Sequence, residues 1–229
     1  MKFTLDYKDT HLKIIADGNL KDIARDEVFR QYKLLEAYMQ KNPVFMISYE
    51  PLAVDNSAPE IVKLMAEAAK KTGVGPSAAV AGAFAELVGK ELLKHSSEIV
   101  VENGGDIFLK LKKEKTIGIH AGQSKFSNKL AFSVRPEETP LGICTSSASV
   151  GHSISLGESD AVTVVAKSAT LADATATAIG NEVKGKHGME KGIEKAKKIS
   201  GVRGVLIIHK NKLGTFGKLP ELVEADFEV

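Results

Sequence analysis

Apolar and polar positions along the chain follow two periods, which predict a mixture of strands and helices. Residues 2–9 and 11–18 are typical of two strands separated by polar turn residues. Residues 22–41 space their apolar side chains at a broadly helical period, and residues 60–73 form a second helical segment that ends at a glycine. Between these helices, residues 43–52 predict a short apolar strand. The first part of the chain is therefore expected to be a strand pair followed mainly by helices.

The middle of the chain changes to hairpin patterns. Residues 74–95 begin with a Gly-Pro turn and predict a long alanine-rich helix, whose first two turns contain only small residues that let another backbone or a ligand come close. Residues 97–112 contain an apolar run, an Asn-Gly-Gly turn and a second apolar run, which predict a hairpin. Residues 115–122 and 129–136 are expected to extend the same sheet. Residues 141–157 are rich in Gly, Ser and Thr, and predict a loop with short extended pieces.

The last third repeats the alternation of strand and helix. Residues 160–169 predict a buried strand that leads into an alanine-rich helix from about Leu171, and residues 201–217 predict a hairpin. Consecutive hairpins imply antiparallel pairing, so the α+β class is favoured over a parallel, doubly wound sheet. A small-residue helix follows a turn at 75–94 and a strand at 168–183. This shared order suggests two similar halves.

Composition narrows the class of protein. The chain has 229 residues, expected to form a single domain over 1–229, with 43% apolar and 26% charged residues, as in soluble globular proteins. Its formal net charge is +2, from 31 basic and 29 acidic residues, which argues against nucleic acid as a partner. No apolar run reaches the ~20 residues of a membrane span, and no signal-peptide pattern is present, so we expect no membrane partner and a cytoplasmic location. The single cysteine, Cys144, excludes an internal disulfide framework.

Three polar residues interrupt the alanine-rich helix near the end of the chain. Asp173, Thr177 and Asn181 are four residues apart, so their oxygens lie along one helix face. Carboxylate, hydroxyl and carbonyl oxygens are the ligands that Mg²⁺ and Ca²⁺ prefer. The alternative is that Asp173 sits in the first helical turn, favoured by the helix dipole, while the hydroxyls bond back to carbonyls. Spacing alone leaves both interpretations open.

Two further segments carry candidate chemistry. The turn with Gly104 and Gly105 offers accessible backbone amides beside the carboxylate of Asp106, although an ordinary hairpin turn has the same pattern. The segment after Cys144 gathers hydroxyl residues and His152, which could donate to phosphates and act as a base, although a buried structural thiol beside them is also typical.

Four stretches together, residues 75–86, 101–109, 142–153 and 160–181, resemble an uncharacterised family related to ApbE, the Mg²⁺-dependent FAD:protein FMN transferases. The resemblance to that branch spans nearly the whole chain, and the resemblance to ApbE proper is concentrated in residues 75–183. It implies a duplicated tunnelling-fold (T-fold-like) α+β architecture with antiparallel sheets and packed helices.

The resemblance also implies functional residues. Asp173 and Thr177 match the metal-holding pair of the family, and a backbone carbonyl from residues 77–82 would complete the metal shell. The matching residues of the FAD pocket are Asn103, Gly104, Gly105, Asp106, Thr145, Ser146 and Ser147. Glu86 would take the place of the acidic residue that the family usually has further along the helix beginning at residues 77–82. His152 matches the histidine implicated in transfer chemistry.

The chain also departs from the ApbE pattern. Ala81 stands where ApbE proteins have a lysine, and the "DPxTG" run expected after the histidine is absent. We therefore weigh an enzyme that uses Mg²⁺ to cleave the pyrophosphate of FAD and transfer FMN against a non-catalytic flavin carrier or sensor. A structural subunit with closely packed helices is a third reading. The expected partners are a flavin nucleotide and an unidentified protein acceptor, with a homodimer left open.

Overall fold

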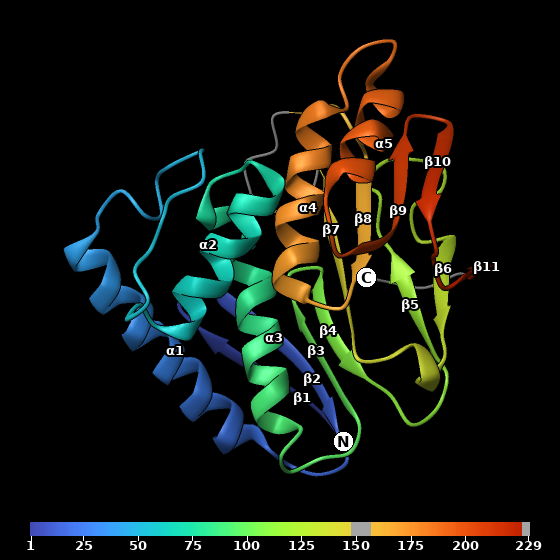
Figure 1. Cartoon of the computed structure of the whole chain (residues 1–229). Coiled ribbons are helices and arrows are strands. Elements are labelled where there is room, and N and C mark those ends of the chain that lie inside the picture. The colour runs from blue at the N-terminus through green and yellow to red at the C-terminus, as the bar shows by residue number, and fades with distance from the viewer. Residues whose placement is uncertain (148–156, 226–229) are drawn as a thin grey trace.

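The computed structural model describes residues 1–147 and 157–225, and its centre is an eight-stranded sheet (Figure 1). In spatial order its strands are β1 (Lys2–Tyr7), β2 (Thr10–Ala16), β3 (Ile99–Asn103), β4 (Asp106–Lys110), β7 (Leu141–Ser146), β8 (Ala161–Ala166), β9 (Val202–His209) and β10 (Lys212–Gly217). All neighbouring strands are antiparallel. The predicted α+β class with antiparallel sheets is therefore confirmed.

Helices cover one face of this sheet (Figure 1). They are α1 (Lys21–Lys41), α2 (Glu60–Thr72), the 3-10 turn η1 (Pro76–Ala79), α3 (Val80–Leu92), α4 (Ala169–Glu182) and α5 (Gly188–Lys198). Two strands, a group of helices and two strands occur once from β1 to β4 and again from β7 to β10, and the two series meet where β4 pairs with β7. The repeated order of elements is consistent with two similar halves, and the duplication itself stays a prediction.

A second, three-stranded sheet covers the other face of the main sheet. It contains β5 (Lys115–Ile119), β6 (Leu130–Val134) and β11 (Glu221–Glu224), with β6 in the middle. The prediction that the first two strands extend the main sheet was wrong. Their apolar side chains, including Ile119 and Phe132, instead form a second core with side chains from the main sheet. The pairing with β11 joins distant parts of the chain, so local pattern could not reveal it.

Two local predictions also differ from the structure. Residues 43–52 contain turns rather than a strand, because Ser48 and Phe45 bond to nearby carbonyls and only Phe45 inserts deeply among the helices. Residues 141–146, predicted as part of a loop, form the central strand β7. Small residues suit this strand because it is enclosed between β4 and β8 and by helix α4.

The helix boundaries follow capping residues. α4 starts at Ala169, two residues before the predicted start, because the hydroxyl of Ser168 accepts the amide of Leu171 at 3.2 Å. α2 ends at Gly73, as predicted, where the backbone adopts a left-handed conformation with φ 78°. α1 begins at Lys21, so Asp22 lies within its first turn.

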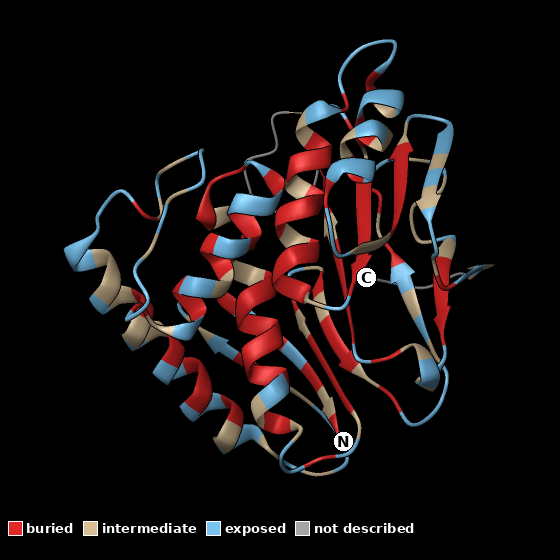
Figure 2. Cartoon of the chain, viewed as in Figure 1, coloured by how far each residue is buried: buried red, intermediate tan, exposed pale blue. Residues whose placement is uncertain are grey.

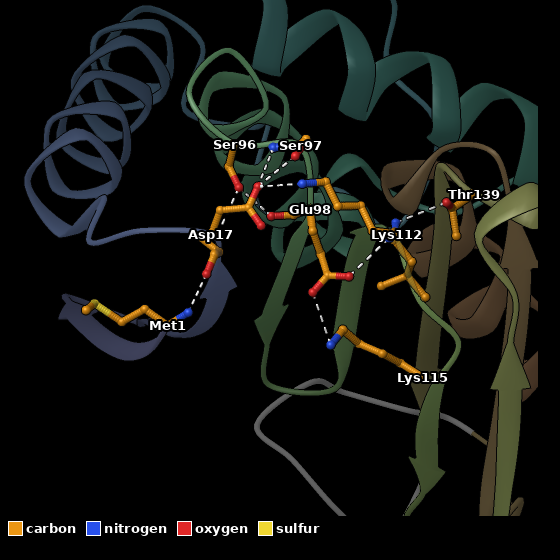
Figure 3. Close-up of polar contacts among 10 residues, drawn as sticks. Met1, Asp17, Ser96, Ser97, Glu98, Lys112, Lys115 and Thr139 are labelled. Atoms are coloured by element: carbon orange, nitrogen blue, oxygen red, sulfur yellow. Dashed lines mark hydrogen bonds and ion pairs between the residues drawn. The ribbon is translucent and has the colours of Figure 1, made fainter.

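A polar network fastens one end of the sheet (Figure 3). Asp17, which follows β2, accepts the amide and hydroxyl of Ser97 at 2.9 and 2.7 Å, and Lys112 Nζ lies 3.4 Å from it. Glu98 accepts the amide of Lys112 at 3.0 Å and pairs with Lys115 at 3.1 Å. Lys112 and Lys115 thus tie the segments around β2, β3 and β4 together.

Asp17→Asn is expected to lower the melting temperature at pH 7. Hydrogen bonds from Ser97, together with Lys112, hold the pKa of Asp17 below its ordinary value. The ionised group therefore stabilises the fold above about pH 4, and this contribution is lost as the pH falls below that value. Thermal unfolding from pH 7 down to pH 3 should show the difference from wild type narrowing. Asp22→Asn, which removes an exposed ion pair with Arg25, is the control and should change little.

Candidate functional site

Helix α4 exposes one polar stripe in an otherwise buried surface (Figure 2). Between Ala169 and Asn181, the partly exposed positions are Asp173, Thr177 and Asn181, and every other residue is buried. A helix of alanines packs closely against its neighbours on all other sides, so these three side chains share the one remaining face. The predicted alignment of the three polar residues along one face of α4 is therefore confirmed.

Helices α3 and α4 touch each other through their backbones. A Cβ placed on Gly82 would lie 2.5 Å from the carbonyl oxygen of Ala169 and 2.8 Å from Cβ of Asp173. Any side chain at Gly82 would therefore force the helices apart. The small residues at the start of α3 permit this approach, as their sequence predicted.

Each of these helices supplies a carboxylate to the other at its N-terminal turn. Asp173 Oδ2 of α4 accepts the amide of Gly82 in the first turn of α3 at 2.8 Å. Glu86 Oε2 of α3 accepts the amide and hydroxyl of Thr170 in the first turn of α4 at 3.0 and 2.9 Å, and the hydroxyl of Ser168 at 2.7 Å. Amides in a first helical turn lack partners within their own helix and attract negative charge. We call this arrangement the reciprocal cap.

The Gly-Gly hairpin turn lies against the same helix ends. Asn103 and Asp106 are paired across the turn, and Gly104 and Gly105 adopt φ values of 61° and 101°. Asn103 Nδ2 donates to the carbonyl of Ala81 at 3.2 Å, which fixes the turn to the start of α3. No atom lies within 4 Å of a Cβ built on Gly104, so the outer side of the turn is open.

Asp106 brings a second carboxylate into this region. It is buried opposite Cys144 of β7, whose thiol donates to the carbonyl of Ala169 at 3.3 Å. Burial raises the pKa of Asp106 well above its usual value, and the charge of Asp173 raises it further. Although Asp173 is partly exposed, the protein atoms packed around its carboxylate exclude water and raise its pKa to about 7, and the amides of Gly82 and Ala81 oppose this shift. The two carboxylates thus repel each other's negative charge in a poorly hydrated place.

Among the residues that the structure describes, no positive side chain is paired with Asp106 or Asp173. Over residues 1–147 and 157–225, neither Asp106 nor Asp173 forms an ion pair with lysine, arginine or histidine. Within the same residues, no three His, Cys, Asp or Glu side chains are grouped to hold a metal ion. A cation here would therefore need hydroxyl, carbonyl or phosphate oxygens as further ligands, which is the usual mode of Mg²⁺. The donor set fits Mg²⁺ on this ground.

The other predicted site residues lie around this centre. Thr145 faces away from α4, with its hydroxyl 2.9 Å from that of Thr163, while Ser146 and Ser147 are buried at the end of β7. Glu86 is held by α4 and by Lys90 at 2.7 Å, and these partners keep its pKa below the ordinary value although burial alone would raise it. His152 lies outside the described residues. The roles of all these residues toward a nucleotide stay predictions.

Sequence reasoning missed two features of this site. It did not foresee that Asp106 lies near Asp173, or that Glu86 caps α4, because these residues are far apart in the chain and no spacing rule connects them. One local signal was available for Glu86, since a carboxylate inside a helix of small apolar residues requires a partner.

Asp173→Asn is expected to raise stability at pH 8 when a chelator removes divalent cations. The folded pKa of about 7 lies above the unfolded value near 4, so ionised Asp173 destabilises the fold, increasingly as the pH rises from 4 to 7. An asparagine can still accept the amide of Gly82 and carries no charge. Urea unfolding should show a gain of about 1–3 kcal/mol at pH 8 that shrinks toward pH 5. An equal gain at both pH values would contradict the assignment of the charge penalty to Asp173.

Two buried threonines of α4 should respond oppositely to replacement by valine. Thr170→Val removes a hydroxyl that donates to Glu86, and should destabilise the fold by about 1–3 kcal/mol. Thr175 is fully buried, and its hydroxyl has no hydrogen-bond partner among the residues the structure covers. Thr175→Val should therefore be neutral or stabilising, as measured by chemical denaturation. A loss for Thr175→Val as large as that for Thr170→Val would contradict this prediction.

Comparison with known proteins gives the family of the chain. The family model described as "AbpE bacteria" matches residues 1–200. A UPF0280 protein of Methanocaldococcus jannaschii is 45% identical over 96% of this chain and 91% of its own length. A UPF0280 protein of Methanobrevibacter smithii is 38% identical over 97% of this chain and 95% of its own length. The chain therefore belongs to this ApbE-related family, as the resemblance of its motifs predicted.

Solved structures of ApbE proteins share the fold. The flavin transferase ApbE from Vibrio cholerae aligns with a TM-score of 0.60 at 17% identity, covering 94% of this chain and 96% of that one. The apo form of the Pseudomonas stutzeri flavinyl transferase ApbE aligns with a TM-score of 0.62 at 17% identity, covering 94% and 93%. At this level of identity, the likeness establishes the ApbE fold. Among the described residues, no helix has the length and apolar character that a membrane span requires.

Proposed function

We propose that this protein binds FAD together with Mg²⁺ and cleaves the FAD pyrophosphate, so that FMN is transferred to a hydroxyl acceptor and AMP is released. The observation that carries the proposal is the pair of carboxylates, Asp106 and Asp173, with raised pKa values and no cationic side chain beside them in the described structure. A divalent cation would relieve their repulsion and hold both in the ionised form. The membership in an ApbE-related family supports the same chemistry.

The residues divide into two groups by what they offer. Asp173 and Thr177 would hold Mg²⁺ from one face of α4, and the open backbone at Gly104 and Gly105 would let the nucleotide approach the main chain. Mg²⁺, when bound, neutralises the charge on the phosphates and at the bridging oxygen. Asp106, at the foot of the turn, adds negative charge that strengthens cation binding.

The transfer step balances as a substitution at phosphorus. The acceptor oxygen forms a bond to the FMN phosphorus, and the bond from that phosphorus to the bridging oxygen breaks, so AMP leaves with the electron pair. The acceptor hydroxyl loses its proton, for which His152 is the proposed base. When water is the acceptor, the products are FMN and AMP. We also propose that the acceptor hydroxyl belongs to a protein and that the reaction takes place in the cytoplasm.

Incubation of purified protein with FAD and Mg²⁺ should give FMN and AMP, separated by chromatography. Asp173→Ala and Thr177→Val should lower the rate at least tenfold, since each removes one proposed cation ligand. Thr175→Val is the matched control, because it makes the same change on a different face of the same helix and should keep the activity. If Asp173→Ala binds Mg²⁺ and FAD as tightly as wild type, the metal assignment is wrong.

A non-catalytic flavin carrier or sensor is the second candidate. Ala81 provides the observation that favours it, because the lysine of ApbE proteins is absent and the carbonyl of Ala81 is instead bonded to Asn103. Tight, Mg²⁺-dependent binding of FAD without release of FMN or AMP, even with added protein acceptors, would establish this alternative.

A further inference from the structure

Strand β1 forms one edge of the eight-stranded sheet and has a hydrogen-bonding side without a strand partner in the described structure. The hydrogen bonds of Met1 decide which residues of β1 bond to β2. The amide of Ala16 donates to the carbonyl of Met1 at 3.0 Å. The amino group of Met1 donates back to the carbonyl of Ala16 (Figure 3). Because hydrogen-bonding direction alternates along an antiparallel strand, residues 1, 3, 5 and 7 face β2. The backbone groups of Lys2, Thr4 and Asp6 therefore point outward.

The outward-facing residues are complementary to a second copy of themselves. When two β1 strands pair antiparallel about a twofold axis at Thr4, Lys2 of each copy lies opposite Asp6 of the other. Lys2, Thr4 and Asp6 of one copy then face Asp6, Thr4 and Lys2 of the other. Since the backbone groups of all these residues point outward, each pair can exchange hydrogen bonds. Lys2 and Asp6 are both exposed on the face away from the helices, where Asp6 also lies 3.0 Å from His11. Two opposite-charge pairs would form on that face.

The opposite face of β1 is apolar and also matches itself. In the same register Phe3 lies opposite Leu5, and Met1 lies opposite Tyr7. Met1 is 64% exposed, and Phe29 of α1, which is 55% exposed, packs edge-on against Tyr7 with ring centroids 5.9 Å apart. These two large apolar side chains are exposed in the single chain, and pairing brings Met1 of one copy toward Tyr7 and Phe29 of the other.

Other registers and the other edge lack this complementarity. A twofold axis at Lys2 or at Asp6 would place like charges opposite each other, which destabilises strand pairing.

At the opposite edge, β10 directs Leu213, Thr215 and Gly217 outward, since Lys218 bonds to Arg203 and fixes the alternation. That edge offers no opposite-charge pair, and glycines weaken it as a strand.

We propose that two copies of this chain associate through their β1 edges, paired antiparallel about Thr4, to form one continuous sheet with the two α1 helices on the same side. The symmetry is isologous, because the same residues contribute on both sides. Short strand pairing gives a small interface, so association is expected at micromolar concentration. This inference does not depend on the proposed flavin chemistry.

Sedimentation or light-scattering mass measurements from about 1 to about 200 μM should show wild type passing from monomer to dimer. Asp6→Lys places lysines opposite each other and should weaken association about tenfold, since two charge pairs change sign. The exchange variant Lys2→Glu with Asp6→Lys restores opposite charges and should restore the dimer.

A matched proline pair tests the backbone part of the interface. Thr4→Pro removes an outward amide from β1 and should prevent dimer formation, whereas Thr215→Pro removes an outward amide from β10 and should not. Circular dichroism checks that each variant is folded. The proposal is overturned if wild type stays monomeric at 200 μM, if Asp6→Lys dimerises as tightly as wild type, or if the charge exchange fails to restore the affinity of the wild-type dimer.

Discussion

The reciprocal cap between α3 and α4 is the contact on which the candidate site depends. Each helix begins with amides that need an acceptor, and each receives a carboxylate from the other helix: Asp173 in one direction and Glu86 in the other. The two bonds act at close quarters because Gly82 lets the backbones touch. Moving either helix along its axis would break both caps, so the positions of Thr177 and Asn181 relative to the start of α3 are fixed by the same contact.

The same arrangement shifts the protonation equilibrium of Asp173 in two opposite directions. Its bond to Gly82 favours the ionised carboxylate, whereas burial near Asp106 favours the protonated one. A group held between these influences titrates near neutral pH and is poised to exchange a proton for a cation. The protonation equilibrium of Asp173 therefore points to a cation site, although few candidate ligands surround it. Glu86 has Lys90 and several α4 donors as partners, and so remains ionised as a structural carboxylate.

Local sequence patterns predicted the hairpins and the helices well, and pairing across distance poorly. The Asn-Gly-Gly turn and the buried run over 160–169 carry their signal within a few residues, and the two hairpin strands and the buried strand were all confirmed. β5 and β6 were assigned to the wrong sheet, because β11 pairs with β6 from the far end of the chain. Residues 43–52 looked like a strand but have no neighbouring strand, so local turns satisfy their backbone instead.

The sequence by itself determined the polar stripe of α4, since a four-residue spacing defines one helix face whatever surrounds it. It also determined that the first turns of α3 would be small enough for close approach. Only the tertiary structure decided that Asp106 joins Asp173 and that Glu86 caps the opposite helix. Those relations depend on how β4, β7 and the two helices pack, and residues so far apart in the chain meet only when the whole sheet has formed.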